Sequence, residues 1–321
     1  MTDMPAKKGW PAPLGLEGVR SRPLAECDHL VHAADFGRAA ALDESAAAII
    51  DAFPRILAGE RLRDLARGIA AAHRAGRAVI FALGGHVVKV GVTPMIIDLM
   101  ERGIIRAIAV NGAFAIHDAE IALAGSTSER VEEVLPDGRF GMATETAELF
   151  GRAAKEGAER ETGLGRALAE AVARSPHAGS SVLGAAARLG VPITVHVAIG
   201  TDTVHMHPGV SGAAIGEASM IDFRIIAAAA RSLGVWVNVG SAVILPEVFL
   251  KVVALLRNLG EPLEDVLAAD LDFERHYRPE TNVLRRPASK GIALTGHHEI
   301  LVPLLRLAIL REIAGTEGGA R

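Results

Sequence analysis

The chain has 321 residues, of which half are apolar and only 4% aromatic, and its formal net charge at pH 7 is −4. A core built from Ala, Val, Ile and Leu suits helices packed on both faces of a buried parallel sheet. No long basic run is present, which argues against a nucleic-acid or anionic-membrane surface. The single cysteine, Cys27, excludes an intrachain disulfide, and the first residues lack the apolar stretch of a signal peptide, so a cytoplasmic location is expected.

Residues 1–40 are expected to form an irregular arm, and helical spacing first occurs over 44–53 and 60–75. A repeating pattern follows, in which an apolar, β-branched run ends in a small-residue turn and leads into an amphipathic helix. This pattern predicts strands at 77–83, 105–110, 192–198, 235–239, 266–271 and 292–294. Helices are expected between them at 93–102, 116–124, 217–231 and 247–258, followed by a polar loop through Lys290 and, at the end, a terminal helix after Gly296.

Strands that alternate with helices are typical of right-handed βαβ units in one parallel sheet. The predicted fold class is therefore α/β, a doubly wound parallel sheet with helices on both faces. We expect one domain over 41–314, with a helical insertion at 127–189, and a frayed tail at 315–321. Asp222 and Arg224 are expected on the surface of the helix that ends at Arg231.

Polar residues gather in the turns that follow the predicted strands, where open parallel sheets bind their ligands. Six of the 12 histidines lie in or just after such turns, namely His86, His117, His205, His207, His297 and His298. Acidic residues accompany them, namely Asp118, Asp202, Asp270, Asp272 and Glu299. The sequence therefore predicts a site rich in imidazole at the carboxyl edge of the sheet.

Three of these turns are built from small residues, namely Gly84-Gly85-His86, Asn111-Gly112-Ala113 and Gly240-Ser241-Ala242. Such turns let backbone N–H groups approach a phosphate at the start of a helix, where the helix dipole is positive. Tight turns also need glycine for their own geometry, and none of the three is a G-x-G-x-x-G fingerprint. Dinucleotide binding and purely structural turns therefore both remain open on these grounds.

His205 and His207 allow a second interpretation of the site. In an extended loop, residues i and i+2 share a face, so both imidazoles could bind one metal ion, with Asp202 nearby and His297 or His298 as further ligands. No H-E-x-x-H or C-x-x-C pattern accompanies them, and the same imidazoles could instead orient a substrate or cap backbone groups. Lys290 is a candidate Schiff-base nucleophile or part of a solvated loop.

The order of these turns resembles the deoxyhypusine synthase family over residues 77–312. The resemblance is carried by 84–101 (GGHVVKVGVTPMIIDLME), 105–120 (IRAIAVNGAFAIHDAE), 193–202, 235–247 and 295–305. It implies a Rossmann-like fold that binds NAD and a homotetramer with sites shared between subunits. That family oxidises spermidine with NAD, forms an enzyme imine and passes an aminobutyl group to a protein lysine.

The resemblance also implies site residues by position. The family's first turn falls on Gly84–His86, its cofactor turn on Asn111–Phe114, and the acidic residue after that turn on His117. The aspartate of its third-strand turn matches Asp202, and its three glycines fall on Gly240–Ala242.

Two departures from the family pattern concern the substrate. The Lys-His-His that follows the three glycines is replaced by Leu245–Glu247, and Lys290 lies in a shorter loop without the family's Trp-Gly pair. The resemblance thus implies a retained NAD scaffold without the family's polyamine-handling residues. The imidazole-rich site suggests a substrate less cationic than spermidine.

The predicted function is an NAD-dependent enzyme that oxidises a small amine or hydroxy compound, with group transfer or elimination to follow. The candidate catalytic residues are His117, His205 or His207 as general base, Asp202 as an orienting group and Lys290 as a covalent nucleophile. Cofactor contacts are expected from the three turns and from Asp270, His297 and His298. The alternatives are a metal-dependent hydrolase or lyase and a non-catalytic NAD-binding sensor. The expected partners are a small-molecule substrate and further copies of this chain, in a tetramer.

Overall fold

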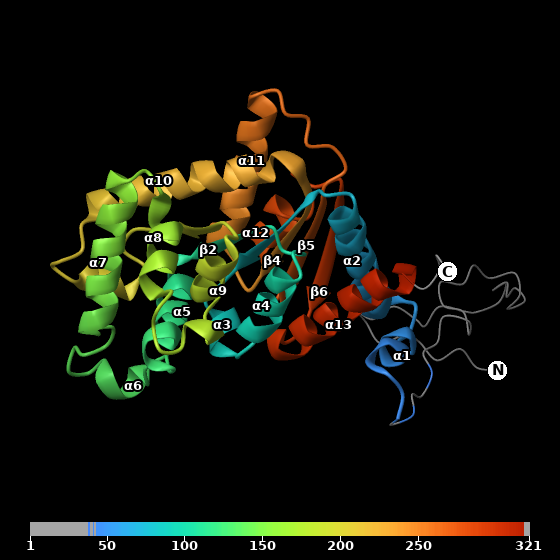
Figure 1. Cartoon of the computed structure of the whole chain (residues 1–321), viewed down its shortest axis with the longest axis horizontal. Coiled ribbons are helices and arrows are strands. Elements are labelled where there is room, and N and C mark those ends of the chain that lie inside the picture. The colour runs from blue at the N-terminus through green and yellow to red at the C-terminus, as the bar shows by residue number, and fades with distance from the viewer. Residues whose placement is uncertain (1–37, 39–40, 42, 318–321) are drawn as a thin grey trace, which may run out of the picture.

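The computed structural model describes residues 38, 41 and 43–317, and within them six strands form one sheet (Figure 1). The strands are β1 (Ala78–Leu83), β2 (Ala107–Asn111), β3 (Ile193–His196), β4 (Leu233–Val239), β5 (Leu267–Asp272) and β6 (Lys290–Thr295). All five strand pairs are parallel, and the order across the sheet is β3-β2-β1-β4-β5-β6. This is the doubly wound, Rossmann-like order, so the predicted fold class is confirmed.

The direction of winding reverses between β1 and β4, the two central strands. Strand β1 pairs with β2 on one side and with β4 on the other, with Leu83 opposite both Val110 and Val239. In doubly wound sheets, the ligand crevice opens at the carboxyl ends of the strands where this reversal occurs. The turns after β1 and β4 therefore meet at the position where a ligand is expected.

Helices connect these strands. They are α1 (Ala46–Asp51), α2 (Leu57–Arg74), α3 (His86–Lys89), α4 (Thr93–Glu101), α5 (Gly112–Ala124), α6 (Val131–Val134), α7 (Thr144–Glu159), α8 (Gly163–Val172), α9 (Val182–Leu189), α10 (Gly212–Ala229), α11 (Ile244–Asn258), α12 (Tyr277–Asn282) and α13 (His298–Glu317). Short 3₁₀ turns cover Ala178–Ser180, Thr203–Met206 and Ala230–Ser232. None of the described helices combines the length and the apolar composition that crossing a bilayer requires.

Two hydrophobic clusters cover the two faces of the sheet because successive side chains of a strand point to opposite sides. On one face, Val79, Phe81 and Leu83 of β1 pack with buried residues of α2, α4, α5 and α13. On the other face, Ile80 and Ala82 pack with buried residues of α10 and α11. Figure 1 shows α2 beside α13 at one end of the molecule and α7 at the other.

The stretch predicted as a helical insertion holds α6 to α9, and it completes the β3 edge of the fold. Helix α8 packs against β3 so closely that a Cβ on Gly165 would lie 2.1 Å from the carbonyl oxygen of Ile193. The polar loop before Lys290 contains α12, and α13 continues to Glu317, past the start of the predicted tail. Most of the predicted N-terminal arm and residues 318–321 lie outside the described residues.

Two buried aspartates join this stretch to the rest of the fold, Asp118 to α5 and Asp222 to α10 and β3. Asp118 of α5 accepts hydrogen bonds from the Ser181 hydroxyl at 2.6 Å and from two backbone N–H groups that open α9. Asp222 of α10 accepts from the backbone N–H groups of Gly165 and Val195, both at 2.8 Å. The expectation of a surface position for Asp222 is wrong, because α10 turns this side chain towards β3 and α8. Burial raises the pKa of Asp118 to about 6 and that of Asp222 to about 7, against the opposing effect of these hydrogen bonds.

Candidate functional site

The small-residue turns after β1, β2 and β4 pack directly on one another. A Cβ on Gly84 would lie 2.0 Å from the carbonyl oxygen of Gly240, and one on Gly85 would lie 3.1 Å from the Cβ of Ala113. The turn after β2 opens the 13-residue helix α5, whereas the turn after β1 opens only the four-residue helix α3. The three turns thus lie together as predicted, and their glycines permit close chain-to-chain contact.

Three aromatic rings cluster at this edge of the sheet, and one of them, His298, lies against the turn after β4. His86 lies 5.5 Å from Phe273 and 5.3 Å from His298, measured between ring centroids. Gly240 has a left-handed φ of +64°, and a Cβ there would lie 2.9 Å from Cε1 of His298. A side chain at position 240 is therefore excluded both by the backbone conformation and by the imidazole.

His298 is fully buried and keeps one ring nitrogen without a partner. Its Nε2 donates to the carbonyl oxygen of Leu271 at 3.1 Å, while Nδ1 has no hydrogen-bond partner among the described residues. Burial lowers the pKa of His298, so the imidazole is neutral and Nδ1 carries a lone pair. A buried acceptor of this kind is suited to a hydrogen bond from a bound molecule. The neighbouring His297 is exposed and lies 3.8 Å from Glu299.

Asp270 lies beneath the turn after β4. It accepts a hydrogen bond at 2.7 Å from the side-chain amide of Asn238, which also donates to the carbonyl oxygen of Ser241 at 2.9 Å. Burial raises the pKa of Asp270 to about 6. Asp270 therefore holds the shape of this turn through Asn238, a role that the sequence did not indicate.

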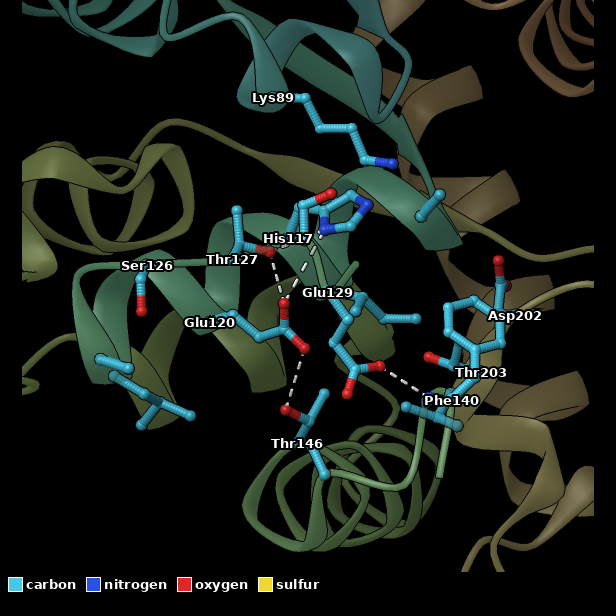
Figure 2. A pocket seen from close by; sticks show the side chains of 18 of the residues that line it. Lys89, His117, Glu120, Ser126, Thr127, Glu129, Phe140, Thr146, Asp202 and Thr203 are labelled. Carbon is cyan, nitrogen blue, oxygen red and sulfur yellow. Dashed lines mark hydrogen bonds and ion pairs between the residues drawn. The ribbon is translucent and has the colours of Figure 1, made fainter. Parts of the chain in front are cut away.

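A cleft of about 960 Å³ opens beside the turn after β2 (Figure 2). One wall is α5, from Ala113 to Ala124, and the opposite walls are the segment 126–146 and the turn 201–204. Lys89 of α3 lies at its edge. This volume is in the range of clefts that hold a small molecule or a cofactor, about 300–1,000 Å³.

His117 of α5 lines this cleft and belongs to a hydrogen-bonded group. Its Nδ1 lies 2.7 Å from the hydroxyl of Thr127, which donates to Glu120, and Thr146 donates to the other oxygen of Glu120 at 3.3 Å (Figure 2). Sequence reasoning found His117 but missed Glu120 and Thr127. The spacing i, i+3 between His117 and Glu120 on a helix is the signal that could have found the carboxylate.

Asp202 lies against the first residue of α5. One carboxylate oxygen lies only 1.9 Å from where a Cβ on Gly112 would stand, so glycine is the residue that fits there. Burial raises the pKa of Asp202. Asp202 and His117 thus line the same cleft, and Gly112 packs against Asp202 at the start of α5.

His205 and His207 have other contacts. Nδ1 of His205 accepts from the backbone N–H groups of Gly200 and Asp202, both at 3.1 Å, and its Nε2 is buried without a partner in the described part of the chain. Nε2 of His207 donates to the carbonyl oxygen of Gly141 at 2.9 Å. Neither residue lines the cleft, where His117 is the single imidazole among the lining residues.

The metal alternative has no ligand set in the described residues. Across 38, 41 and 43–317, no three His, Cys, Asp or Glu side chains gather where they could hold a metal ion. Lys290 is also separated from the other candidates. It is the first residue of β6, at the amino edge of the sheet, where it donates to Asp64 of α2 at 3.0 Å. The covalent role predicted for Lys290 therefore has no support from its position.

These features define a doubly wound α/β protein with a cleft at the carboxyl edge of its sheet. No known protein-family model matches the chain, and no curated protein matches it. Among solved structures, unliganded AgrE is similar with a TM-score of 0.52 and 14% identity, over 82% of this chain and 34% of that chain. A conserved putative LOR/SDH protein from Methanococcus maripaludis S2 is similar with a TM-score of 0.50 and 15% identity, over 84% of this chain and 71% of that chain.

These similarities establish the fold alone, because the sequence identities are low. The ternary complex of AgrE with ornithine and NAD+ has a TM-score of 0.50 and 14% identity, over 83% of this chain and 35% of that chain. The chain thus spans about a third of the length of AgrE. A putative deoxyhypusine synthase from Entamoeba histolytica overlaps more loosely, with a TM-score of 0.43 and 11% identity over 84% of this chain and 94% of that chain, so membership of that family stays a prediction.

Proposed function

We propose that this chain binds NAD across the turns after β1, β2 and β4 and oxidises a small amine or hydroxy compound in the adjacent cleft. The proposal rests on the position of the cleft in the fold. The cleft, with His117 in its wall, opens at the carboxyl edge of the sheet beside the turn after β2. Its lining residue Ala113 packs on Gly85 of the turn after β1, next to the switch point where doubly wound folds bind dinucleotides. The choice of cofactor is supported by AgrE, which has a similar fold and was solved with ornithine and NAD+.

The residues at the edge fit a dinucleotide. Gly84 and Gly85 let the turns after β1, β2 and β4 pack closely at the switch point, and Nδ1 of His298 is a buried acceptor beside Gly240. The carboxylate of Asp202 at the start of α5 repels a phosphate and suits a ribose hydroxyl instead. The proposal therefore assigns the phosphates to the turns after β1 and β4 and a ribose to Asp202.

The cleft composition favours an amine among the possible substrates. Four carboxylates line it, namely Glu120, Glu129, Glu145 and Asp202, against the single lysine Lys89. A negative wall attracts an ammonium group and raises its local concentration.

His117 would act as the general base. When bound, NAD would supply the hydride acceptor for the carbon that carries the amine or hydroxyl group. The proton released from that nitrogen or oxygen passes to Nε2 of His117, which has no hydrogen-bond partner among the described residues. The product is an imine or a carbonyl compound.

Calorimetric titration tests the cofactor assignment. The wild-type chain should bind NAD+ and NADH and should discriminate against NADP+, whose extra phosphate meets Asp202. Ala113→Leu places a larger side chain between the turns after β1 and β2, in the wall of the cleft. It should weaken NAD binding by about 10-fold or more, equal to about 1.4 kcal/mol. Ala124→Leu makes the same change at the far end of α5, also in the cleft wall, and should leave NAD binding unchanged.

Three other outcomes have clear meanings. No binding of either NAD form at millimolar concentration would overturn the proposal. Equal losses of NAD affinity in Ala113→Leu and Ala124→Leu would show that the cofactor does not bind at the turns. Binding of NAD+ without NADH production from any primary amine, amino acid or hydroxy acid would favour the sensor alternative over an enzyme.

A further inference from the structure

We infer that Glu120 and Thr127 are positioning residues that hold His117 in one tautomer, with the proton on Nδ1 and the lone pair on Nε2. The inference deepens the proposed function, because it rests on that proposal for the role of His117 as a base. The tautomer itself follows from the geometry of three side chains. Figure 2 shows the second ring nitrogen of His117 pointing away from Glu120.

The direction of each hydrogen bond follows from counting hydrogens. An ionised carboxylate can only accept, and a threonine hydroxyl has one hydrogen to give. The Thr127 hydroxyl contacts both Glu120 and Nδ1 of His117, the latter at 2.7 Å. Since its hydrogen goes to Glu120, its oxygen must accept from His117, which places a proton on Nδ1. Neutral His117 then carries its lone pair on Nε2.

Glu120 is held in the ionised form that this arrangement needs. Burial alone would raise the pKa of Glu120, but the nearby His117 imidazole and the hydrogen bonds from Thr127 and Thr146 bring the pKa below its usual value. Both carboxylate oxygens have a donor, Thr127 on one and Thr146 on the other. The carboxylate also lies 3.7 Å from Nδ1, so it stabilises the imidazolium that forms when Nε2 takes a proton.

The local fold explains how these residues meet. His117 and Glu120 occupy positions i and i+3 of α5 and so share one face of the helix. Gly125 ends α5 with a left-handed φ of +69°, a conformation that glycine adopts at little cost. The chain then reverses, and Thr127 lies over the last turns of the helix that it has just left.

NMR of the ligand-free protein with ¹⁵N-labelled histidine tests the inference, because long-range ¹H–¹⁵N spectra distinguish the two imidazole tautomers. A His117→Asn spectrum identifies the His117 signals. Wild type should show Nδ1–H as the dominant form at neutral to mildly alkaline pH. Thr127→Val removes the hydroxyl and should make Nδ1–H the minor form, and Thr127→Ser should restore the wild-type pattern.

Two further variants sharpen the test. Glu120→Gln replaces an acceptor with an amide that can donate to Thr127, which frees the Thr127 hydroxyl to donate to Nδ1 and should move the His117 proton to Nε2. Thr146→Val removes the other hydroxyl bound to Glu120 without touching His117 and should leave the tautomer unchanged. Circular dichroism checks that each variant is folded.

The outcomes separate this inference from the proposed function. Nε2–H as the dominant form in wild type, or an unchanged His117 tautomer in both Thr127→Val and Glu120→Gln, would overturn the inference. If either variant fails to fold, the other one and the wild-type spectrum still decide. If the Nδ1–H tautomer is confirmed but NAD does not bind, the inference about Glu120 and Thr127 holds and only the proposed function is overturned.

Discussion

The contact between Gly112 and Asp202 determines which residues are allowed at the start of α5. The virtual Cβ of residue 112 lies 1.9, 2.5 and 2.9 Å from the three terminal atoms of the Asp202 side chain, so any substitution must move the carboxylate. The cost of a substitution at position 112 therefore depends on what occupies position 202. This dependence makes the pair measurable by a double-mutant cycle.

Gly112→Ala should destabilise the chain by about 1–3 kcal/mol because the new methyl group overlaps with Asp202. Asp202→Ala clears that space, so the double variant should recover most of the loss, with a coupling energy of about 1–2 kcal/mol. Urea unfolding of the wild type, both single variants and the double variant gives the cycle. Strictly additive losses would show that the two residues do not meet.

The sequence predicted part of this residue-level picture. Strand ends place His117, Asp202 and the three turns at one edge of the sheet, since all parallel strands end on the same side. The same rule cannot tell which side chains turn into loop contacts, as those of His205 and His207 do. Thr127 was missed because its role depends on the chain reversal after α5.

At the scale of elements, Asp222 joins α10, α8 and β3 through one carboxylate oxygen. Sequence patterns placed this residue on a helix correctly but gave the wrong face, because α10 is apolar nearly all round and its periodicity does not mark the buried side. A buried carboxylate with two backbone donors is costly to ionise and costly to remove. These two costs have different pH dependences, which allows them to be separated.

Asp222→Asn keeps one oxygen for Gly165 and Val195 but removes the titration. The folded-state pKa of Asp222 is about 7, above the usual 3.8, so the folded state holds an extra proton between these values. The contribution of Asp222 to stability is therefore complete below pH 4 and is lost as pH rises through 7. The unfolding free energy of wild type relative to Asp222→Asn should fall with rising pH, by at most about 1.4 kcal/mol per pH unit.

Urea unfolding of both chains from pH 4 to 7.5 measures this difference in unfolding free energy. Asp222→Ala is the companion variant, since it leaves two buried N–H groups unpaired and should cost about 2–4 kcal/mol at low pH, where Asp222→Asn is mild. A flat difference between wild type and Asp222→Asn would show that Asp222 titrates normally.

At the scale of the whole molecule, no single segment of the sequence predicts the order of the strands in the sheet. The alternation of strands and helices predicted one parallel sheet, and each predicted strand overlaps a strand of the structure. The pairing of β1 with β4 follows from the doubly wound topology that this alternation favours. The cleft escaped prediction because its outer wall, residues 126–146, is shaped by a reversal rather than by periodic structure.

The assembly is a prediction at this scale. We expect a homotetramer, on the resemblance stated for the sequence, with a mass near four times the 33.6 kDa of the chain. Apolar side chains that a monomer would leave in water, such as Leu135, Ile199 and Met206, are consistent with a partner surface. Light scattering coupled to size exclusion measures the mass, and a 33.6 kDa species at all micromolar concentrations would rule out the tetramer.

The central position of β1 has a consequence for synthesis on the ribosome. Residues 78–83 pair with β2 early, but their second edge pairs only with residues 233–239, which emerge much later. Until then the nascent chain carries an unpaired edge of the sequence AVIFAL, entirely apolar and without a charge to discourage pairing with other chains. A translation pause between β3 and β4 therefore leaves the most aggregation-prone segment of the sheet half covered, and chaperone demand should be greatest in that interval.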